Sequence, residues 1–466
     1  MTVRPEQPEP FLRGSAYGAY GDVTYPRADP TDLARLPADI WHAAVVPAGV
    51  RLELVGDAEA VEVAYRNSTS NLGYRGHGAG VGFELWRNGQ RVCAEQAELG
   101  DGSVTLPLGG GPADRVAIVY LPEGMHPTIV SVTPVGGEIA PAPRRPRWLA
   151  YGDAATQGWL AASPAQAWTA IAARKVLLDV VNMGYAGAGR FEIACGEQLA
   201  DLPASVITIA GGANCWGRIA HNAAMVREQV RAFLEVVRHG HTETPIVVVS
   251  PLVRPDAEAV LNRLGATMGD IRDAVESAVE ERIAGGDSCL RLVQGAEILT
   301  ADLLADGIHP DDEGHKRVAA AVGKVLAQVV PSAPTRSEVA RVDGVRPPRP
   351  IDTGQAATAV TPPPTTSRSG RPPQRPRSNR PSSAAGTPVT DTPVAPVSPA
   401  AAPVTGTPVT GTPVAPASPV DVTPATTPAG DGPAGGRPAP VPEISTDPDG
   451  PAVGSPVDTP AVPTSA

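Results

Sequence analysis

The C-terminal part of this chain lacks nearly all the side chains that build a hydrophobic core. From Pro331 to Ala466 there is no leucine, phenylalanine, tryptophan, tyrosine, methionine, cysteine or histidine. Proline, threonine, alanine, valine and serine dominate instead, and such a stretch buries too little apolar surface to offset the entropy lost on ordering. We therefore expect a disordered tail over residues 331–466, following a folded body of about 330 residues.

The chain also lacks an excess of positive charge. Its formal net charge is −11, and the tail adds nothing to it, because ten arginines there are balanced by ten acidic residues. The negative charge therefore lies in the body, which argues against nucleic-acid binding by that part. An arginine-rich stretch from Arg368 to Arg380 leaves an anionic partner open for the tail. We favour a solvated spacer, so a partner of the tail stays unknown.

Cysteines are few and apolar runs are short. Cys93, Cys195, Cys215 and Cys289 have the spacing of neither metal ligands nor a disulfide framework, so we expect free thiols, no metal and no cofactor. No apolar run approaches the length of a membrane span. The first residues lack the apolar segment of a signal peptide, and together these features predict a cytoplasmic protein.

Residues 39–140, after an N-terminal segment over 1–38, have the pattern of antiparallel β structure. Apolar and polar residues alternate there in short segments, the period of half-buried strands. Asn88 and Gly89 separate two of these segments and predict a type I′ hairpin, whose turn needs positive φ. Short strands joined by turns favour a small β-sandwich, with a stiff proline-rich hinge after it at 140–146. The predicted strands are 51–55, 61–65, 83–87, 91–93, 116–120 and 128–132.

Beyond residue 147 the pattern changes to alternating strands and helices. This alternation predicts an α/β domain over 147–330, with a parallel five-stranded sheet between two layers of helices. One helix is expected to begin with Ser163 as its N-cap, followed by Pro164. Three further amphipathic helices are expected around 226–237, 268–279 and 318–329. The predicted strands are 149–151, 178–182, 206–210, 246–250 and 290–293.

Four short motifs follow the strands of this domain. In a doubly wound sheet, sites form at the carboxyl ends of the strands, which is where these motifs are expected. One motif alone would be a weak signal, but four in this order are specific. They are Gly-Asp-Ala at 152–154, Gly187 in a glycine-rich loop, Gly-Gly-Ala-Asn at 211–214, and Asp-Gly-Ile-His at 306–309.

In this order, the motifs resemble those of the SGNH/GDSL hydrolases over residues 147–330. The family's first motif reads Gly-Asp-Ser, whereas Ala154 occupies the nucleophile position here. The resemblance implies a three-layer, flavodoxin-like fold and ester hydrolysis without a cofactor. The preceding β region is similar to the sandwich attached to certain carbohydrate-esterase-like members.

The resemblance also assigns a role to each matching residue. It implies that His309 is the general base and that Asp306 orients it. Gly187 would donate a backbone N–H to the oxyanion hole, and Asn214 a side-chain amide. Preorganised donors of this kind stabilise the tetrahedral oxyanion of ester cleavage. Ala154 keeps its own N–H, so it can still contribute to the hole. Trp159 and Trp216 are candidate pocket residues.

Other polar side chains offer weaker alternatives. Thr156 lies two residues after Ala154, where threonine is common in the family, and we do not take it as a replacement nucleophile. Cys215 is interpreted as a small buried side chain. His239 and His241 are interpreted as a solvated loop, because they lie between a predicted helix and a predicted strand. Asp306 and His309, taken alone, would also fit a loop that enters a helix.

Three interpretations of function remain open. The first is a hydrolase of carboxylic acyl or acetyl esters, with acylated carbohydrates among its substrates, impaired by Ala154. The second is a pseudoenzyme that binds an acylated ligand without turning it over. The third is an active esterase whose serine was replaced by design. All three involve a small acyl-ester or acylated-sugar ligand.

Overall fold

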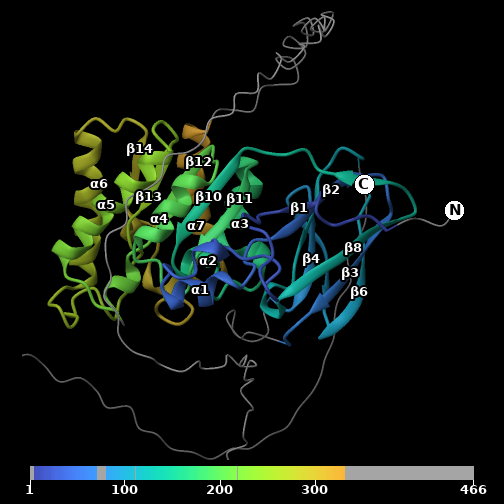
Figure 1. Cartoon of the computed structure of the whole chain (residues 1–466), viewed down its shortest axis with the longest axis horizontal. Helices are drawn as coiled ribbons and strands as arrows, with labels where there is room; N and C mark the ends of the chain where they lie inside the picture. The colour runs from blue at the N-terminus through green and yellow to red at the C-terminus, as the bar shows by residue number, and fades with distance from the viewer. Residues whose placement is uncertain (1–4, 71–79, 111, 218, 331–466) are drawn as a thin grey trace, which may run out of the picture. The chain divides into compact units, whose positions relative to one another are not determined.

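The computed structural model describes residues 5–70, 80–110, 112–217 and 219–330 (Figure 1). The predicted tail lies outside these residues. No helix within these ranges has both the length and the apolar character needed to cross a membrane.

The α/β domain is built on a five-stranded parallel sheet, as predicted. Its strands come in the order β11-β10-β12-β13-β14, so β10, the first strand of this domain, lies between the second strand, β11, and the third, β12. This is the strand order of flavodoxin-like folds. The strands are β10 (Arg147–Gly152), β11 (Asp179–Gly184), β12 (Val206–Ala210), β13 (Ile246–Val249) and β14 (Leu290–Val293).

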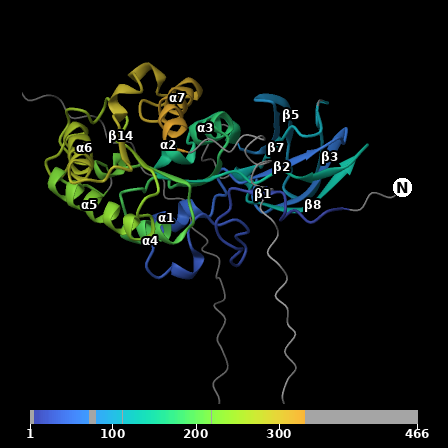
Figure 2. The same cartoon turned by 90° about the horizontal axis from the view of Figure 1, so that it is seen from above.

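Helices cover both faces of this sheet because successive side chains of each strand point to opposite faces. Leu149 and Tyr151 pack in one core cluster, and their neighbours Trp148 and Ala150 pack in another. Figure 2 shows the two helical layers. The first layer contains α1 (Ala38–Ala44), α4 (Ile193–Asp201), α5 (Ala223–Gly240) and α6 (Met268–Ala284), and the second contains α3 (Trp168–Val176) and α7 (Asp312–Val329).

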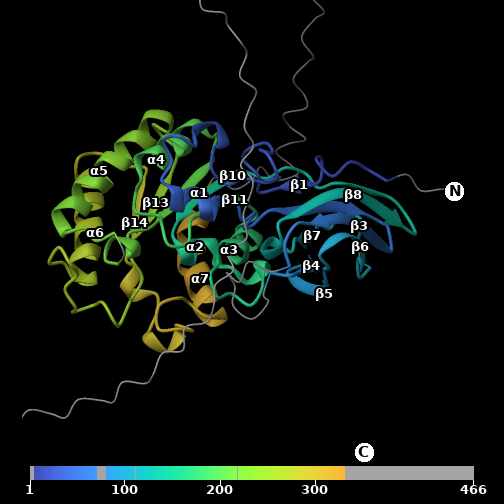
Figure 3. The same ribbon diagram turned by 60° about the horizontal axis from the view of Figure 1, so that its bottom comes forward.

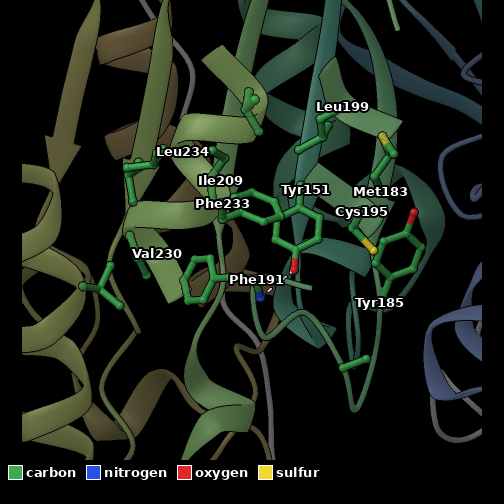
Figure 4. Close-up of a cluster of buried hydrophobic side chains, with 14 of the residues drawn as sticks. Tyr151, Met183, Tyr185, Phe191, Cys195, Leu199, Ile209, Val230, Phe233 and Leu234 are labelled. Atoms are coloured by element: carbon green, nitrogen blue, oxygen red, sulfur yellow. Dashed lines mark hydrogen bonds between the residues drawn. The ribbon is translucent and has the colours of Figure 1, made fainter. Parts of the chain in front are cut away.

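Aromatic side chains fill the core beneath the first layer (Figure 4). The rings of Tyr151 and Phe233 lie 4.9 Å apart between their centroids. The Tyr151 hydroxyl accepts a hydrogen bond from the Phe191 backbone N–H at 2.8 Å and donates to Glu192 at 2.7 Å. These bonds satisfy the one polar atom of a fully buried side chain, and they fix the loop between β11 and α4.

The N-terminal region is an antiparallel sandwich, also as predicted (Figure 3). Apolar side chains of a six-stranded and a three-stranded sheet share one core. Asn88 and Gly89 have φ of 55° and 74°, as a type I′ turn requires. The larger sheet holds β1 (Leu12–Arg13), β2 (Arg51–Gly56), β7 (Ala117–Tyr120), β4 (Gly82–Arg87), β5 (Gln90–Gln96) and β9 (Ile139–Pro141), and the smaller holds β6 (Gly100–Pro107), β3 (Ala60–Asn67) and β8 (Pro127–Val135).

The segment predicted to be a stiff hinge is tied into the fold. Its first residues form β9, which pairs with β2, and the Ala142 carbonyl accepts a hydrogen bond from Arg13 at 2.7 Å. The outer face of the larger sheet also packs on the α/β domain, through Ile118 and Tyr120 against Ala170 of α3. Proline density predicted a stiff hinge, and strand pairing and the Arg13 hydrogen bond hold its first residues in the fold.

Ser163 is the N-cap of a helix with Pro164 at its first position, as predicted, but this helix is short and the Ser163 side chain bonds elsewhere. Residues Pro164–Gln166 form a short 3₁₀ helix, and Ser163 makes no side-chain capping bond to it. Its hydroxyl donates instead to Glu84 of β4 at 2.6 Å. The helical stretch α3 begins only at Trp168. A partner in the sandwich therefore outcompetes the local cap that the sequence pattern suggested.

Candidate functional site

Ala154 lies at the start of α2 (Ala154–Gln157), directly after β10. Its residue surface is only 7% exposed. Asp153 caps this short helix by accepting a hydrogen bond from the Ala155 N–H at 3.1 Å. Burial raises the pKa of Asp153 to about 6, although the Ala155 hydrogen bond and the charge of His309 act in the opposite direction. Asp153 therefore positions the turn. The Trp159 N–H donates to the Ala154 carbonyl at 2.9 Å, and the Trp159 ring centroid lies 6.0 Å from that of His309, so His309 lies beside this turn.

The loop after β11 is bound tightly to this turn. The Asn182 amide donates to the Thr156 carbonyl at 2.8 Å, and the Ala186 N–H donates to Gln157 at 2.8 Å. Gly187 follows with φ of 76°, and nothing lies within 4 Å of the position that a Cβ would take there. Gly187, the predicted oxyanion donor, therefore borders an open space beside the turn that carries Ala154.

Asn214 belongs to a 3₁₀ turn, η4 (Ala213–Cys215), that follows β12. Its side-chain amide donates a hydrogen bond to the Ala188 carbonyl, and the Gly212 N–H donates to Gly189 at 3.2 Å. These bonds join the third loop to the second. An amide nitrogen carries two hydrogens, so Asn214 can hold this bond and still offer a second N–H.

His309 and Asp306 are hydrogen-bonded in the loop before α7. The Nδ1 atom of His309 lies 2.8 Å from Oδ2 of Asp306, and the His309 backbone N–H donates to Oδ1 at 2.7 Å. Partial burial raises the pKa of Asp306. The hydrogen bonds from His309 and from the Ile308 N–H have the larger combined effect, so the pKa lies below its usual value. The His309 side chain is 23% exposed, so solvent or a ligand can reach it.

Of the two tryptophans predicted to line the pocket, Trp159 lies at the site. Its ring centroid is 6.0 Å from that of His309. Trp216 packs elsewhere: its indole donates to the Val260 carbonyl at 2.8 Å, and Arg254 lies over its ring. Trp216 therefore supports the loop after β13.

The other hydroxyl and thiol groups near the turn are buried. Thr156 has no exposed surface, and its hydroxyl lies under Gly152, where an added Cβ would be 2.2 Å away. Cys215 is buried as expected, and burial raises the pKa of its thiol to about 12. Neither group can serve as an accessible nucleophile. The interpretation of His241 as solvated is wrong, because its ring is buried and Nε2 lies 2.8 Å from the Leu199 carbonyl.

A cavity of about 700 Å³ adjoins the site, and no pattern in the sequence predicts it. Gly187 and Trp159 line it on the α/β side, His42 of α1 lines a second side, and His126 comes from the turn before β8. These residues are far apart in the chain and follow no periodic pattern. The His126 backbone has a positive φ of 49°, which the sequence pattern does not predict.

Comparisons with known proteins agree with this architecture. Residues 147–327 match the sequence model of the GDSL-like lipase/acylhydrolase family. No protein with a curated description matches the chain. The structure of a salicylyl-acyltransferase, SsfX3, from a tetracycline biosynthetic pathway is similar with a TM-score of 0.60 at 22% identity, covering 74% of this chain and 98% of the other.

A second solved structure is of a protein described as a GDSL-like lipase from Bacteroides ovatus. It gives a TM-score of 0.59 at 19% identity and covers 70% of this chain and 97% of the other. At these identities both similarities concern the fold. The family match and the motifs in their order identify residues 147–327 as a GDSL-like lipase/acylhydrolase domain, and the two solved structures show a similar fold.

Proposed function

We propose that the α/β domain contains a site for acyl esters like that of the GDSL hydrolases. In this site Ala154 prevents nucleophilic attack by the protein on the ester. The observation that carries the proposal is the 2.8 Å hydrogen bond between His309 and Asp306, beside the turn that holds Ala154. A carboxylate on Nδ1 fixes the imidazole tautomer that leaves Nε2 free to accept a proton. The ester would be an acyl or acetyl ester, with acylated carbohydrates as one candidate class.

In this proposal the ester carbonyl oxygen is held by three donors. They are the N–H groups of Ala154 and Gly187 and the second amide hydrogen of Asn214. Their loops are hydrogen-bonded to one another, so the donors need little reorganisation as negative charge develops on the oxygen. None of these contributions depends on the side chain at position 154.

The missing serine oxygen changes the chemistry. A methyl group cannot attack a carbonyl, and the neighbouring hydroxyl of Thr156 is buried. The remaining route is direct attack by a water molecule whose proton passes to His309. In a well-studied serine hydrolase, the site without its nucleophile retains about 10³–10⁴-fold acceleration over water. We therefore expect slow turnover by the chain as it stands.

The second candidate function is binding without turnover. It is supported by Ala154 itself, because the substitution leaves the proposed donors and the base in place. Such a protein would bind an acylated ligand without hydrolysing its ester bond. The measured rate of hydrolysis by the unmodified chain separates this candidate from a slow hydrolase.

The decisive experiment compares the chain with its Ala154→Ser variant on p-nitrophenyl acetate. We expect the variant to gain several orders of magnitude in kcat/KM, and the further change His309→Ala to abolish the gain. His239→Ala, which alters an exposed histidine elsewhere, is the control and should leave the gain intact. If Ala154→Ser binds and cleaves no ester, the proposed roles of the four motifs are wrong.

A further inference from the structure

The loop that carries Gly187 is held by hydrogen bonds to its backbone carbonyl groups. Those of Ala188 and Gly189 accept from the loop after β12. The Gly187 carbonyl accepts from Nη1 of Arg190 at 2.9 Å. Gly187 has no side chain, and nothing lies within 4 Å of the position that a Cβ would take there. The orientation of Gly187 therefore depends on hydrogen bonds of the backbone rather than on side-chain packing.

This loop needs such restraints because it is rich in glycine. Gly187 and Gly189 have φ of 76° and 75°, and glycine can leave such values at little cost because it has no Cβ. Before Gly187, the Ala186 N–H donates to Gln157 at 2.8 Å. After it, the bond from Arg190 fixes the Gly187 carbonyl. The Gly187 N–H, the proposed oxyanion donor, therefore lies between two restrained peptide groups.

The guanidinium of Arg190 is itself fixed by two carboxylates. The Arg190 side chain is only 7% exposed. Its Nη2 atom donates to Oδ2 of Asp39 at 2.6 Å and lies 3.2 Å from Oε1 of Glu192. A guanidinium is planar, so its N–H groups point in directions that are fixed relative to one another. Once the carboxylates hold Nη2, the direction of the bond from Nη1 to the Gly187 carbonyl is also set.

Both carboxylates are attached to parts of the fold outside the loop. Oε2 of Glu192 accepts a hydrogen bond from the buried Tyr151 hydroxyl of β10 at 2.7 Å. Asp39 belongs to α1, and Arg27 connects this helix to β11 by donating to a carbonyl of α1 and to the Asn182 carbonyl at 3.2 Å. The guanidinium between the two carboxylates therefore joins the core of the α/β domain to the N-terminal segment.

We propose that Arg190 is a positioning residue for the oxyanion hole, which holds the Gly187 carbonyl so that the Gly187 N–H stays directed at the ester oxygen, with Asp39 as its anchor. This inference rests on the proposed function, because a fixed donor matters where negative charge develops on a bound oxygen. A misplacement of about 1 Å can cost about 10²-fold in rate. Asp39 lies outside residues 147–327, which match the family model, so the N-terminal segment would contribute to the site.

Kinetics on p-nitrophenyl acetate, in the Ala154→Ser background, test the effect on the reaction. Removal of a whole oxyanion donor costs about 10²–10³ in kcat, and Arg190→Met leaves the donor present but less restrained. We therefore expect Arg190→Met to lower kcat about tenfold to hundredfold and to change KM less than about threefold. Asp39→Asn alters a partly exposed anchor and endangers folding less, and it should lower kcat about threefold to tenfold.

Arg238→Met is the matched control. The Arg238 side chain is equally buried and pairs with Asp287 at 2.8 Å, but it lies at the end of α5 that precedes β13, at the edge of the sheet opposite to the four motifs. Arg238→Met should lose stability in urea, as Arg190→Met does, and keep its kcat. Guanidinium chloride at about 50 mM should restore the kcat of Arg190→Ala at least about fivefold, whereas the same concentration of sodium chloride should not.

Hydrogen exchange, followed by mass spectrometry on the full chain without the serine, tests the loop independently of turnover. Arg190→Met should speed exchange of the amides of residues 185–190 at least about tenfold, and Arg238→Met should leave it unchanged. Unchanged exchange in Arg190→Met would overturn the proposal. So would faster exchange without a loss of kcat, or equal losses of kcat in Arg190→Met and Arg238→Met.

Failure of the proposed function gives a different result. If Ala154→Ser cleaves no ester, the proposed function is wrong, and with it the role of Arg190 in the reaction. Faster exchange in Arg190→Met would then show only that Arg190 holds the loop. If Ala154→Ser cleaves the ester and Arg190→Met cleaves it equally fast, the proposed function stands and the role of Arg190 is excluded.

Discussion

Asp306 binds His309 through both of its carboxylate oxygens. One oxygen accepts a hydrogen bond from the imidazole Nδ1, and the other accepts one from the His309 backbone N–H. Both bonds lie within four consecutive residues. The ring orientation therefore depends on one short loop, and little on packing from distant parts of the chain. The same loop leads directly into α7, whose N-cap is Asp311.

Asp306→Asn should remove most of the activity that Ala154→Ser restores. The amide can donate to Nδ1 and thereby favour the wrong tautomer, and the corresponding change in a serine protease lowers kcat by about 10⁴. We expect a loss of about 10³–10⁴ in kcat on p-nitrophenyl acetate, with KM nearly unchanged. Asp302→Asn, an exposed acid nearby, is the control. A loss below tenfold would show that Asp306 does not orient the base.

Gly187 and Gly189 should respond differently to alanine. Both have positive φ, but a Cβ at Gly189 would lie 2.4 Å from the Gly152 carbonyl, whereas the position at Gly187 is open. Gly187→Ala should cost about 1 kcal/mol of unfolding free energy from backbone strain. Gly189→Ala should cost at least about 3 kcal/mol, because the turn carrying Ala154 must move. Urea unfolding measures both, and equal losses would contradict this packing.

Arg51→Met should destabilise the contact between the sandwich and the α/β domain. The buried guanidinium bonds Glu53 at 2.7 Å and Asp179 at 2.9 Å, so its removal leaves two carboxylates without their partner. We expect a loss of about 3–5 kcal/mol in unfolding free energy. Arg66→Met breaks the exposed pair with Asp101 and should have almost no effect. Similar losses of unfolding free energy in Arg51→Met and Arg66→Met would show that the broken buried ion pairs are not the cause of the destabilisation.

The same network predicts a loss of stability in acid. Burial raises the pKa of Glu53, but Arg51, Arg145 and Arg13 together lower it more, so the folded-state pKa lies below the usual 4.5. The contribution of Glu53 is therefore present above about pH 4.5 and is lost as the pH falls through the folded-state pKa. Unfolding measured between pH 3 and pH 6 should show this decline in the chain and a weaker one in Glu53→Gln.

Asp153→Asn should have the opposite pH dependence. Burial raises the pKa of Asp153 from 3.8 to about 6, so its contribution is complete below pH 3.8 and is lost as the pH rises through 6. Asparagine can cap α2 without a charge. The free energy of unfolding of Asp153→Asn should equal that of the unmodified chain near pH 4 and exceed it by about 1–2 kcal/mol at pH 8. Lower stability of the variant at pH 8 would show that the charged carboxylate is favourable.

The fold was largely predictable because both β regions carry strong local patterns. The five parallel strands are short apolar segments, and each of the described α/β strands lies where a predicted strand was placed. Strand β6 was missed because it begins Gly-Asp-Gly, residues that are typical of turns. The N-cap position of Ser163 was predicted, but the partner of its hydroxyl was missed because Glu84 is distant in the chain.

The resemblance to the GDSL hydrolases, the order of the four motifs and the alanine at position 154 can be read from the sequence, because each depends on short stretches of neighbouring residues. That Trp159 lies beside His309 while Trp216 does not, and that Thr156 is buried, follows from the tertiary structure. The cavity with His126 likewise exists only in the folded chain. Its walls come from the sandwich, α1 and the α/β loops, and contacts at such separations leave no periodic signal in the sequence.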